Sequence, residues 1–456
     1  QTEVTVYNQG FGFVKEVRSM NLKPGRQRIA VEDVAQQIET NSVAIRSLTD
    51  PAGLNVLEQN YQYDLISPIA ILNKCVGKNI RFLRVLPNGQ KETLEGKLLS
   101  SPTAIIGDQN GGGQTTWNGM VIQTNDGRLL LNPTGEIQVD TLPEGLISRP
   151  TLLWDLESDK GGAQQVELSY LTRGMNWNAD YVLTLDGKGA ADLQGWVTLV
   201  NGSGATFKDA KLKLLAGDVN RVQNRNMPMG RGGGAMEDMA KAPAMTEEAL
   251  FEYHLYTVTR PTTIANNEQK QVSLLEAFGF AVTKKLIVDS MRDYGVYYPS
   301  EGEVGTGAIK PQVRIEFVNS KTNKLGMPMP MGNVKVYQRD SSGSVQMLGE
   351  DHIEHTPKDE KLSLAIGQSF DIVASRKRMN FRRLSDRSFE ETYEVELRNR
   401  KEVADTVHVL ERHYGDWSIT KSSEKFEKLD AITQQYVVPL KAGEVKKIQY
   451  TVVTKW

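Results

Sequence analysis

The chain has 456 residues, which is too long for one ordinary hydrophobic core and indicates about three domains. Its 54 Lys and Arg nearly balance its 56 Asp and Glu, so the formal net charge of -2 gives no strong field for nucleic acid or an anionic membrane. The single cysteine, Cys75, excludes an intrachain disulfide. No run of about 18 apolar residues is present, so we expect no transmembrane helix.

Residues 1–63 are expected to form an N-terminal β region that packs on the central part of the chain. The segment 41–46 alternates with period two, which is typical of a strand. A short helix is predicted at 67–75, because Ser67 is a suitable N-cap and Pro68 occupies the first helical position. Cys75 lies on the apolar side of this helix, which favours a buried residue over a reactive thiol.

Residues 64–145 contain, besides that helix, about five short segments with strand character. The pairs Asn88-Gly89 and Asp126-Gly127 are strong hairpin signals. Short strands in this number and spacing predict a small closed barrel of SH3-like or Sm-like type. Some such barrels bind RNA, but no basic cluster with interleaved aromatic residues is present here, so we do not infer RNA binding.

Residues 146–320 are expected to form a central β-sandwich, since segments such as 166–171 and 210–215 alternate clearly. The clearest interruption is a Met- and Gly-rich insertion at 223–249, which has no periodicity and cannot bury a face. This insertion is either a flexible loop or a segment ordered by a partner. Strand character resumes at 251–256, which places the insertion inside one sandwich.

Residues 321–456 are predicted to form a C-terminal immunoglobulin-like β-sandwich. The segment 333–337 is expected to pair with 345–348 across a Ser-Ser-Gly turn, and 391–399 alternates strictly. The predicted fold class is therefore mainly β, with immunoglobulin-like β-sandwiches, one small SH3/Sm-like barrel and very little helix.

Several segments in this order resemble a known family. They include 168–171, Gly174-Met175-Asn176-Trp177, 216–220, 251–256 with 260–264, 349–357, and Tyr414-Gly415-Asp416-Trp417. Together they resemble an uncharacterised bacterial family, the domain of unknown function four-one-three-nine of mucoidy-inhibitor-like proteins. The resemblance is clearest over roughly 150–456. It implies an exported, β-rich bacterial protein and supplies no catalytic residue. Some relatives carry a long coiled coil, but this chain has no sustained heptads.

The best candidates for metal ligands in the sequence are Glu350, His352 and His355. On one strand His352 would lie on the face opposite His355, which is poor geometry for ligands that must converge. The set His408, Glu411 and His413 is weaker for the same reason. Thioether clusters suit Cu(I), but methionine also forms adaptable contact surfaces. Four methionines in the insertion are therefore interaction candidates: Met227, Met229, Met236 and Met239.

No nucleophile elbow, P-loop, zincin or dinucleotide-binding motif is present in the sequence, which favours a protein that is not an enzyme and has no cofactor. The basic run at 376–378 is interpreted as a solvated strand face, with anionic lipid or polysaccharide as the alternative. Trp177, Tyr181, Trp196 and Trp417 are expected in sandwich cores, with a sugar-binding platform as the alternative.

The chain starts at Gln1 and passes directly into strand-like residues, which is typical of a chain after removal of a signal peptide; the alternative is a sequence that begins within a longer chain. The sequence thus predicts a non-catalytic structural or protein-interaction component of the bacterial cell envelope. Its location would be periplasmic, outer-membrane-associated or extracellular. Its partners would be other envelope proteins or itself, paired through β-edges. The alternatives are an exported Cu- or Zn-binding protein and an exported polysaccharide-binding protein.

Overall fold

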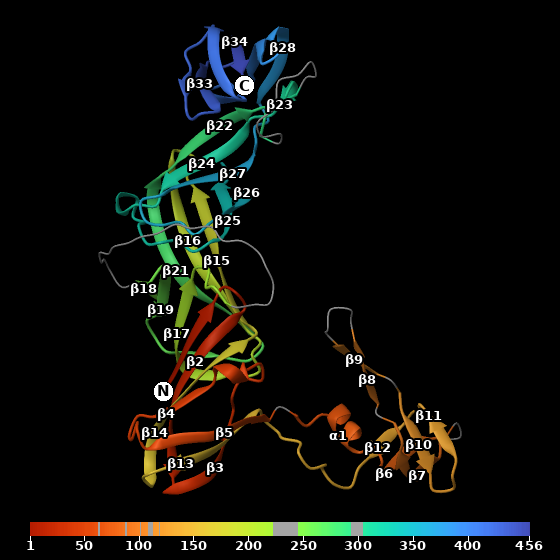
Figure 1. The fold of residues 1–456 in the computed structure, drawn as a ribbon. Helices are drawn as coiled ribbons and strands as arrows, with labels where there is room; N and C mark the ends of the chain where they lie inside the picture. The colour runs from red at the N-terminus through yellow and green to blue at the C-terminus, as the bar shows by residue number, and fades with distance from the viewer. Residues whose placement is uncertain are drawn as a thin grey trace.

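The computed structural model describes residues 1–62, 64–86, 89–100, 102–107, 113–117, 119–221, 245–292 and 304–456. Most of these residues lie in strands, and they contain a single α-helix, α1 (Pro68–Lys74), with two short 3-10 helices, η1 (Thr40–Ser42) and η2 (Lys321–Asn323). The predicted mainly β fold with very little helix is therefore confirmed. Figure 1 shows the strands grouped into several open sheets.

Three sheets enclose the first and largest core. The largest sheet has eight strands: β18 (Met245–Leu250), β19 (Tyr253–Val258), β17 (Phe207–Ala216), β1 (Thr2–Tyr7), β2 (Phe11–Leu22), β14 (Gly162–Arg173) and β4 (Ala44–Ser47), with β20 (Thr262–Ile264) beside β17. The second sheet has three: β3 (Gly25–Glu32), β13 (Thr151–Ser158) and β5 (Leu54–Gln62). The third has five: β21 (Glu268–Ala281), β16 (Ala190–Asn201), β15 (Met175–Leu185), β25 (Gly332–Arg339) and β26 (Val345–Ile353).

Period-two alternation explains how these sheets meet. In β15 the buried residues are Met175, Trp177, Ala179 and every second residue thereafter, and the opposite face is partly exposed. Trp154, Trp177 and Tyr181 are among the bulkiest side chains of this first core. The N-terminal residues belong to this core, because β1 pairs in parallel with β17 and antiparallel with β2.

Two further sheets enclose a second core near the C-terminus. One has six strands: β27 (Lys361–Gln368), β24 (Gln312–Val318), β22 (Thr283–Asp289), β30 (Asp405–Arg412), β33 (Thr433–Leu440) and β32 (Glu427–Lys428). The other has five: β23 (Gly307–Ile309), β28 (Ile372–Ser385), β29 (Ser388–Asn399), β34 (Val445–Lys455) and β31 (Asp416–Ser422). Figure 1 shows this pair of sheets beyond the first core, at the end of the molecule that carries the C-terminus.

The predicted boundary between residues 320 and 321 does not coincide with the division between the two cores. Strand β25 follows that boundary in sequence but pairs in parallel with β15 of the first core. Strand β22 precedes the boundary but pairs in parallel with β30 of the second core. Strand β24 contributes to both, since Ile315 and Phe317 lie in the first core and Val313 packs against the second.

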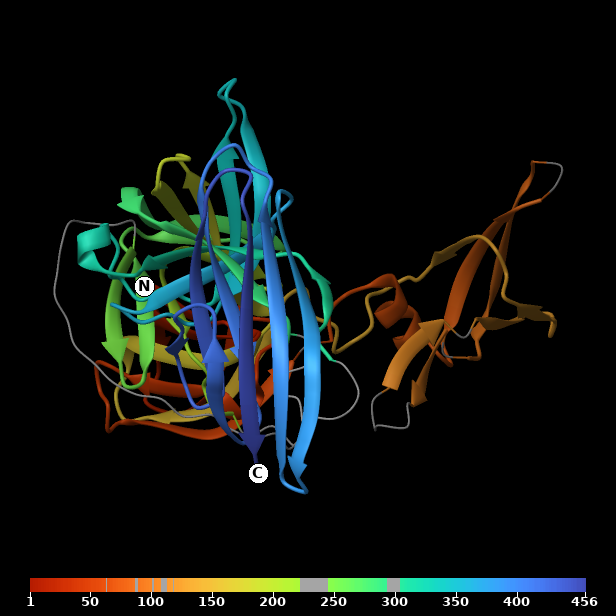
Figure 2. The same ribbon diagram turned by 90° about the horizontal axis from the view of Figure 1, so that it is seen from above.

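The region 64–146 carries its own smaller core and lies to one side of the stacked sheets in both views (Figures 1 and 2). Its main sheet has five strands: β11 (Leu129–Leu131), β10 (Val121–Thr124), β7 (Lys91–Leu98), β6 (Asn79–Val85) and β12 (Glu136–Gln138). A separate pair consists of β8 (Thr103–Gly107) and β9 (Gly113–Trp117). The five-stranded sheet is open, and the described residues form no closed barrel of the kind predicted here.

The predicted helix is confirmed in position and in its cap. The N–H of Ala70 donates to Ser67 Oγ at 3.1 Å, and Pro68 is the first helical residue. Cys75, the C-cap residue, is buried with Leu72 against the small sheet. The predicted insertion at 223–249 is described only from Met245 onward, where its last residues form the edge strand β18.

Candidate functional site

The three residues proposed as metal ligands do not converge on one point. Glu350 and His352 are exposed on the same face of β26, and His352 Nδ1 lies 3.1 Å from Asn333 Oδ1. His355 lies beyond the end of that strand, where its Nδ1 accepts from the Met331 N–H at 3.1 Å. Burial lowers the pKa of His355. Within the described residues, no group of three or more His, Cys, Asp and Glu is placed to hold a metal ion.

The interaction candidates Met227, Met229, Met236 and Met239 lie outside the described residues. The expectation that the four aromatic residues lie in the core is confirmed for Trp177 and Tyr181. Trp177 is buried and donates from Nε1 to the Leu215 carbonyl at 3.3 Å. Tyr181 is buried and its hydroxyl donates to the Pro330 carbonyl at 2.7 Å. Trp196 and Trp417 are half-buried.

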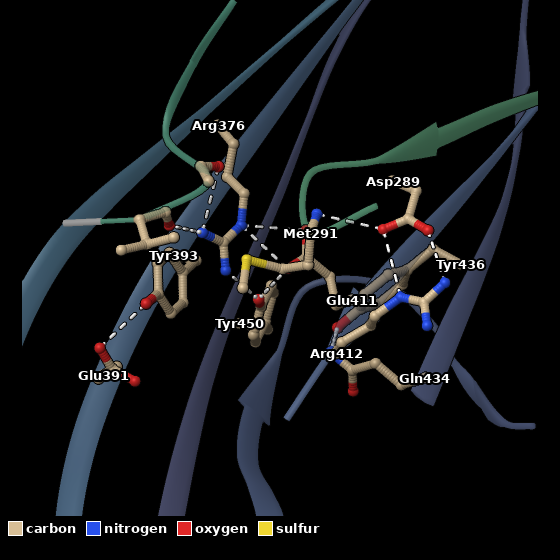
Figure 3. Close-up of polar contacts among 12 residues, drawn as sticks. Asp289, Met291, Arg376, Glu391, Tyr393, Glu411, Arg412, Gln434, Tyr436 and Tyr450 are labelled. Atoms are coloured by element: carbon tan, nitrogen blue, oxygen red, sulfur yellow. Dashed lines mark hydrogen bonds and ion pairs between the residues drawn. The ribbon is translucent and has the colours of Figure 1, made fainter. Parts of the chain in front are cut away.

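The most buried ion pair among the described residues of the second core joins Arg376 on β28 to Glu411 on β30 (Figure 3). Arg376 Nε lies 2.9 Å from Glu411 Oε2 and 3.2 Å from Oε1, and the two side chains are 4% and 1% exposed. The interpretation of 376–378 as a solvated strand face is therefore wrong for Arg376. It is also wrong for Arg378, whose side chain is 7% exposed and pairs with Glu391 at 3.2 Å, whereas Lys377 is exposed. Alternation along β28 explains the difference, since Ile372, Ala374 and Arg376 all face the core.

Tyrosines and backbone carbonyls complete the surroundings of this ion pair. The Tyr450 hydroxyl donates to Glu411 Oε2 at 2.6 Å, and the Arg376 guanidinium lies 3.7 Å from the centre of the Tyr393 ring. Nη1 of Arg376 donates to the carbonyls of Val304 and Gly305 at 3.3 and 3.4 Å. Desolvation by itself would lower the pKa of Arg376, but Glu411 together with Tyr450 and Tyr393 outweighs it, so the pKa is raised. Arg376 is therefore charged throughout the physiological range.

Two polar atoms beside this ion pair have no hydrogen-bond partner among the described residues: His413 Nε2 and Gln434 Oε1. Both residues are buried, and His413 packs against Trp417 with the rings tilted by 40° and their centres 4.6 Å apart. Desolvation, with the nearby charges of Arg376 and Lys428, lowers the pKa of His413 to about 3. His413 is therefore a neutral imidazole at physiological pH and carries no charge into the core.

The opposite face of β30 carries a second ion pair at a solvent-filled cleft. Arg412 points away from the core, and its Nη2 lies 2.8 Å from Asp289 Oδ2 at the end of β22 (Figure 3). The same carboxylate accepts from the Met291 N–H at 3.1 Å, which fixes the chain as it leaves the strand. The cleft has a volume of about 520 Å³, and Gly305, whose carbonyl is held by Arg376, forms part of its wall.

A different kind of surface lies on the small sheet. Leu130 packs into the small core, so its neighbours in β11, Leu129 and Leu131, point to the outer face, where they are 57% and 71% exposed. Val121 of β10 lies opposite Leu131 on that face, and Leu99 beside it is also exposed. These four residues, which we call the β11 patch, form an apolar area at the edge of an open sheet.

Comparison with known proteins does not assign the chain to a family. No protein-family model matches the chain, and no curated protein matches it at a significant level. Among the described residues, none of the helices has the length and apolar character needed to cross a membrane. The resemblance noted in the sequence, and the function that it implies, therefore stay predictions.

Sequence reasoning missed the ion pairs of Arg376 with Glu411 and of Arg412 with Asp289. Arg376 was visible only as part of a basic run, and Glu411 only as a member of a weak histidine set. The usable signal was the alternation of small or apolar residues with Arg376, since a cation at an inward position of a buried strand requires an anion on a facing strand.

Proposed function

We propose that this chain is a non-catalytic interaction protein of the bacterial cell envelope, and that it self-associates through the β11 patch. The observation that carries this proposal is an uncharged edge strand of three leucines with two of them exposed. Edge strands of soluble proteins are usually blunted by charge or proline, because unpaired N–H and C=O groups accept strands of other chains. The envelope location is supported by the resemblance described above.

A second copy of the chain is the occupant that fits this edge best. Antiparallel pairing of β11 with itself would set Leu129 of each copy opposite Leu131 of the other on one face. Leu130 would lie opposite Leu130 of the second copy on the inner face. Both faces of the sheet would therefore extend across the dimer interface. The formal net charge of only -2 opposes such association very little.

The test replaces Leu131 by Lys and measures self-association by sedimentation equilibrium over a range of protein concentrations. Burial of one leucine contributes about 1 to 2 kcal/mol, and a symmetric joint loses it twice, so the dimer should weaken roughly 100-fold. Phe370→Lys is the matched control, because Phe370 is 90% exposed in the turn between β27 and β28, outside the region 64–146 that carries the β11 patch.

Two outcomes would contradict this proposal. A wild-type chain that stays monomeric at the highest soluble concentration excludes self-association. Equal weakening by Leu131→Lys and Phe370→Lys excludes the β11 patch as its site. Crosslinking with mass spectrometry on intact cells separates pairing with a second copy from pairing with another envelope protein.

The finer fold assignment is likewise a proposal. We infer that the two larger cores are immunoglobulin-like sandwiches, on the support of long antiparallel strands whose inner faces meet in one core in each case. An experimental structure whose strand connections differ from a Greek key would overturn this assignment.

A further inference from the structure

The cleft on the outer face of the second core is lined by an unusual excess of positive charge. Its lining includes Arg292, Lys310, Arg314 and Arg412, and the only carboxylate among its described lining residues is Asp289. Without Arg292, the described lining still carries Lys310, Arg314 and Arg412 against Asp289, and this excess of cations raises the local concentration of anions. A volume of about 520 Å³ lies in the range of small-molecule sites.

The arginines are held in place by neighbouring side chains, which organises the cleft before any ligand enters. Arg412 gives two of its five N–H groups to Asp289. Arg314 donates to the Ser363 hydroxyl at 2.8 Å and to the Ser363 carbonyl at 2.6 Å. Guanidinium groups that are fixed in this way lose little conformational freedom when they bind an oxyanion.

Two further groups in the cleft are available to a ligand. Lys310 is exposed and has no partner among the described residues, so its ammonium group is a free cation at the cleft. Ser290 is only 9% exposed, lines the cleft, and its hydroxyl has no hydrogen-bond partner in the described part of the chain. A buried hydroxyl without a partner is costly, and a ligand oxygen would satisfy it.

Hydrogen bonds from the buried Arg376 hold the backbone at Val304 and Gly305, which forms part of the cleft wall. Arg376 donates to the carbonyls of Val304 and Gly305 from the buried side, and Gly305 faces the cleft beside Ser290. Gly305 has a φ of +67°, and a Cβ there would lie 2.9 Å from the Ser290 carbonyl oxygen. The close approach of these two backbone segments therefore requires glycine.

We propose that this cleft binds a small ligand through an oxyanion group, either a carboxylate or a phosphate. Arg314, Arg412 and Lys310 would supply the charge, and the Ser290 hydroxyl would donate to one oxygen. This site lies on the outer face of the second core and is independent of the β11 patch, so the failure of either proposal leaves the other standing.

The test is calorimetric titration of the full chain at low ionic strength with succinate, inorganic phosphate and the neutral analogue succinamide. The expected result is one-to-one binding of succinate or phosphate that weakens as salt is added, with no binding of succinamide. The two anions distinguish a carboxylate ligand from a phosphate ligand, and binding of either one supports the proposal.

Three variants locate the binding. Lys310→Gln and Ser290→Ala should each weaken it about fivefold, which corresponds to roughly 1 kcal/mol. Lys425→Gln removes the same charge from an exposed lysine outside the cleft and should leave the affinity unchanged. Circular dichroism melting of each variant checks that the fold is intact.

Three results would overturn the proposal. The first is that neither anion binds the wild-type chain. The second is that Lys425→Gln weakens binding as much as Lys310→Gln, which would indicate diffuse surface charge. The third is that succinamide binds as well as succinate, since a neutral ligand gains nothing from the cations of the cleft.

Discussion

Replacement of Arg376 by Met should destabilise the second core more than any surface substitution. The variant leaves Glu411, whose side chain is 1% exposed, without its cation, so that the Tyr450 hydroxyl remains its closest donor. It also removes the contact with the Tyr393 ring and the donor for the Gly305 carbonyl. Removal of one partner of a buried ion pair typically costs about 3 to 5 kcal/mol.

That cost should appear as a loss of roughly 10 °C in the melting transition of the second core, given the size of this part of the chain. The assay is thermal and urea unfolding followed by tryptophan fluorescence, to which Trp417, beside His413 in that core, contributes. The unfolding of a multi-core chain can proceed in steps, so the free energy is taken from the transition that this tryptophan reports. Arg382→Met is the matched control: Arg382 is also on β28, but its side chain is 62% exposed in its pair with Glu390, and it should cost at most about 0.5 kcal/mol.

The double variant Arg376→Met with Glu411→Leu tests the reason for the loss. Burial of two apolar side chains in place of the pair should return the free energy of unfolding to within about 2 kcal/mol of the wild type. The reasoning fails if Arg376→Met costs no more than Arg382→Met. It fails equally if the double variant is less stable than the single one, because the uncompensated charge of Glu411 would then not be the cause.

Two other predictions concern the same fold. The pKa of His413 is about 3 in the folded chain, below the ordinary value of 6.5, so the unfolded chain binds more protons between these values and stability falls as the pH is lowered through that window. Between pH 6.5 and pH 5 this contributes about 2 kcal/mol, and His413→Phe, measured by urea unfolding at both pH values, should remove that part of the loss; an unchanged pH dependence would show that His413 is not buried and neutral. Gly349→Ala should lower the free energy of unfolding by about 2 kcal/mol, because a Cβ there would lie 2.0 Å from the Ile366 carbonyl oxygen. A Cβ at Gly367 would have nothing within 4 Å, so Gly367→Ala should be neutral or slightly stabilising. Thermal melting of both variants measures the difference. Equal effects of the two alanines would contradict the close approach at Gly349.

Local features of the fold were predictable from the sequence because local physical rules decide them. The helix at 68–74 followed from Ser67 and Pro68, and the hairpin of β25 and β26 followed from alternation on both sides of a Ser-Ser-Gly turn. Each of these features depends on neighbours within about twenty residues. The hydrogen-bonding groups of a cap or a tight turn are satisfied within that distance, so the signal is present in a short stretch of sequence.

The assembly of the sheets was not predictable in the same way. Three parallel contacts join strands that are distant in sequence: β1 with β17, β15 with β25, and β22 with β30. Alternation indicates that a strand has an inner face, but it does not say which other strand lies beside it. For this reason the sequence predicts a boundary at residue 320, between two successive blocks of strands. The two cores do not divide there, because β22 and β25 each pair across that boundary.

The candidate site shows the same limit at the level of single residues. Glu411 and Arg412 are adjacent on β30, so a strand must send one of them inward and the other outward. The sequence shows this opposition but cannot tell which of the two is buried. The structure shows which of the two is buried. Glu411 pairs with Arg376 inside the core, and Arg412 pairs with Asp289 outside it. A slip of one residue in β30 would bury Arg412 against Arg376 and expose Glu411 at the cleft, so the two ion pairs together specify the register of the strand that separates the core from the cleft.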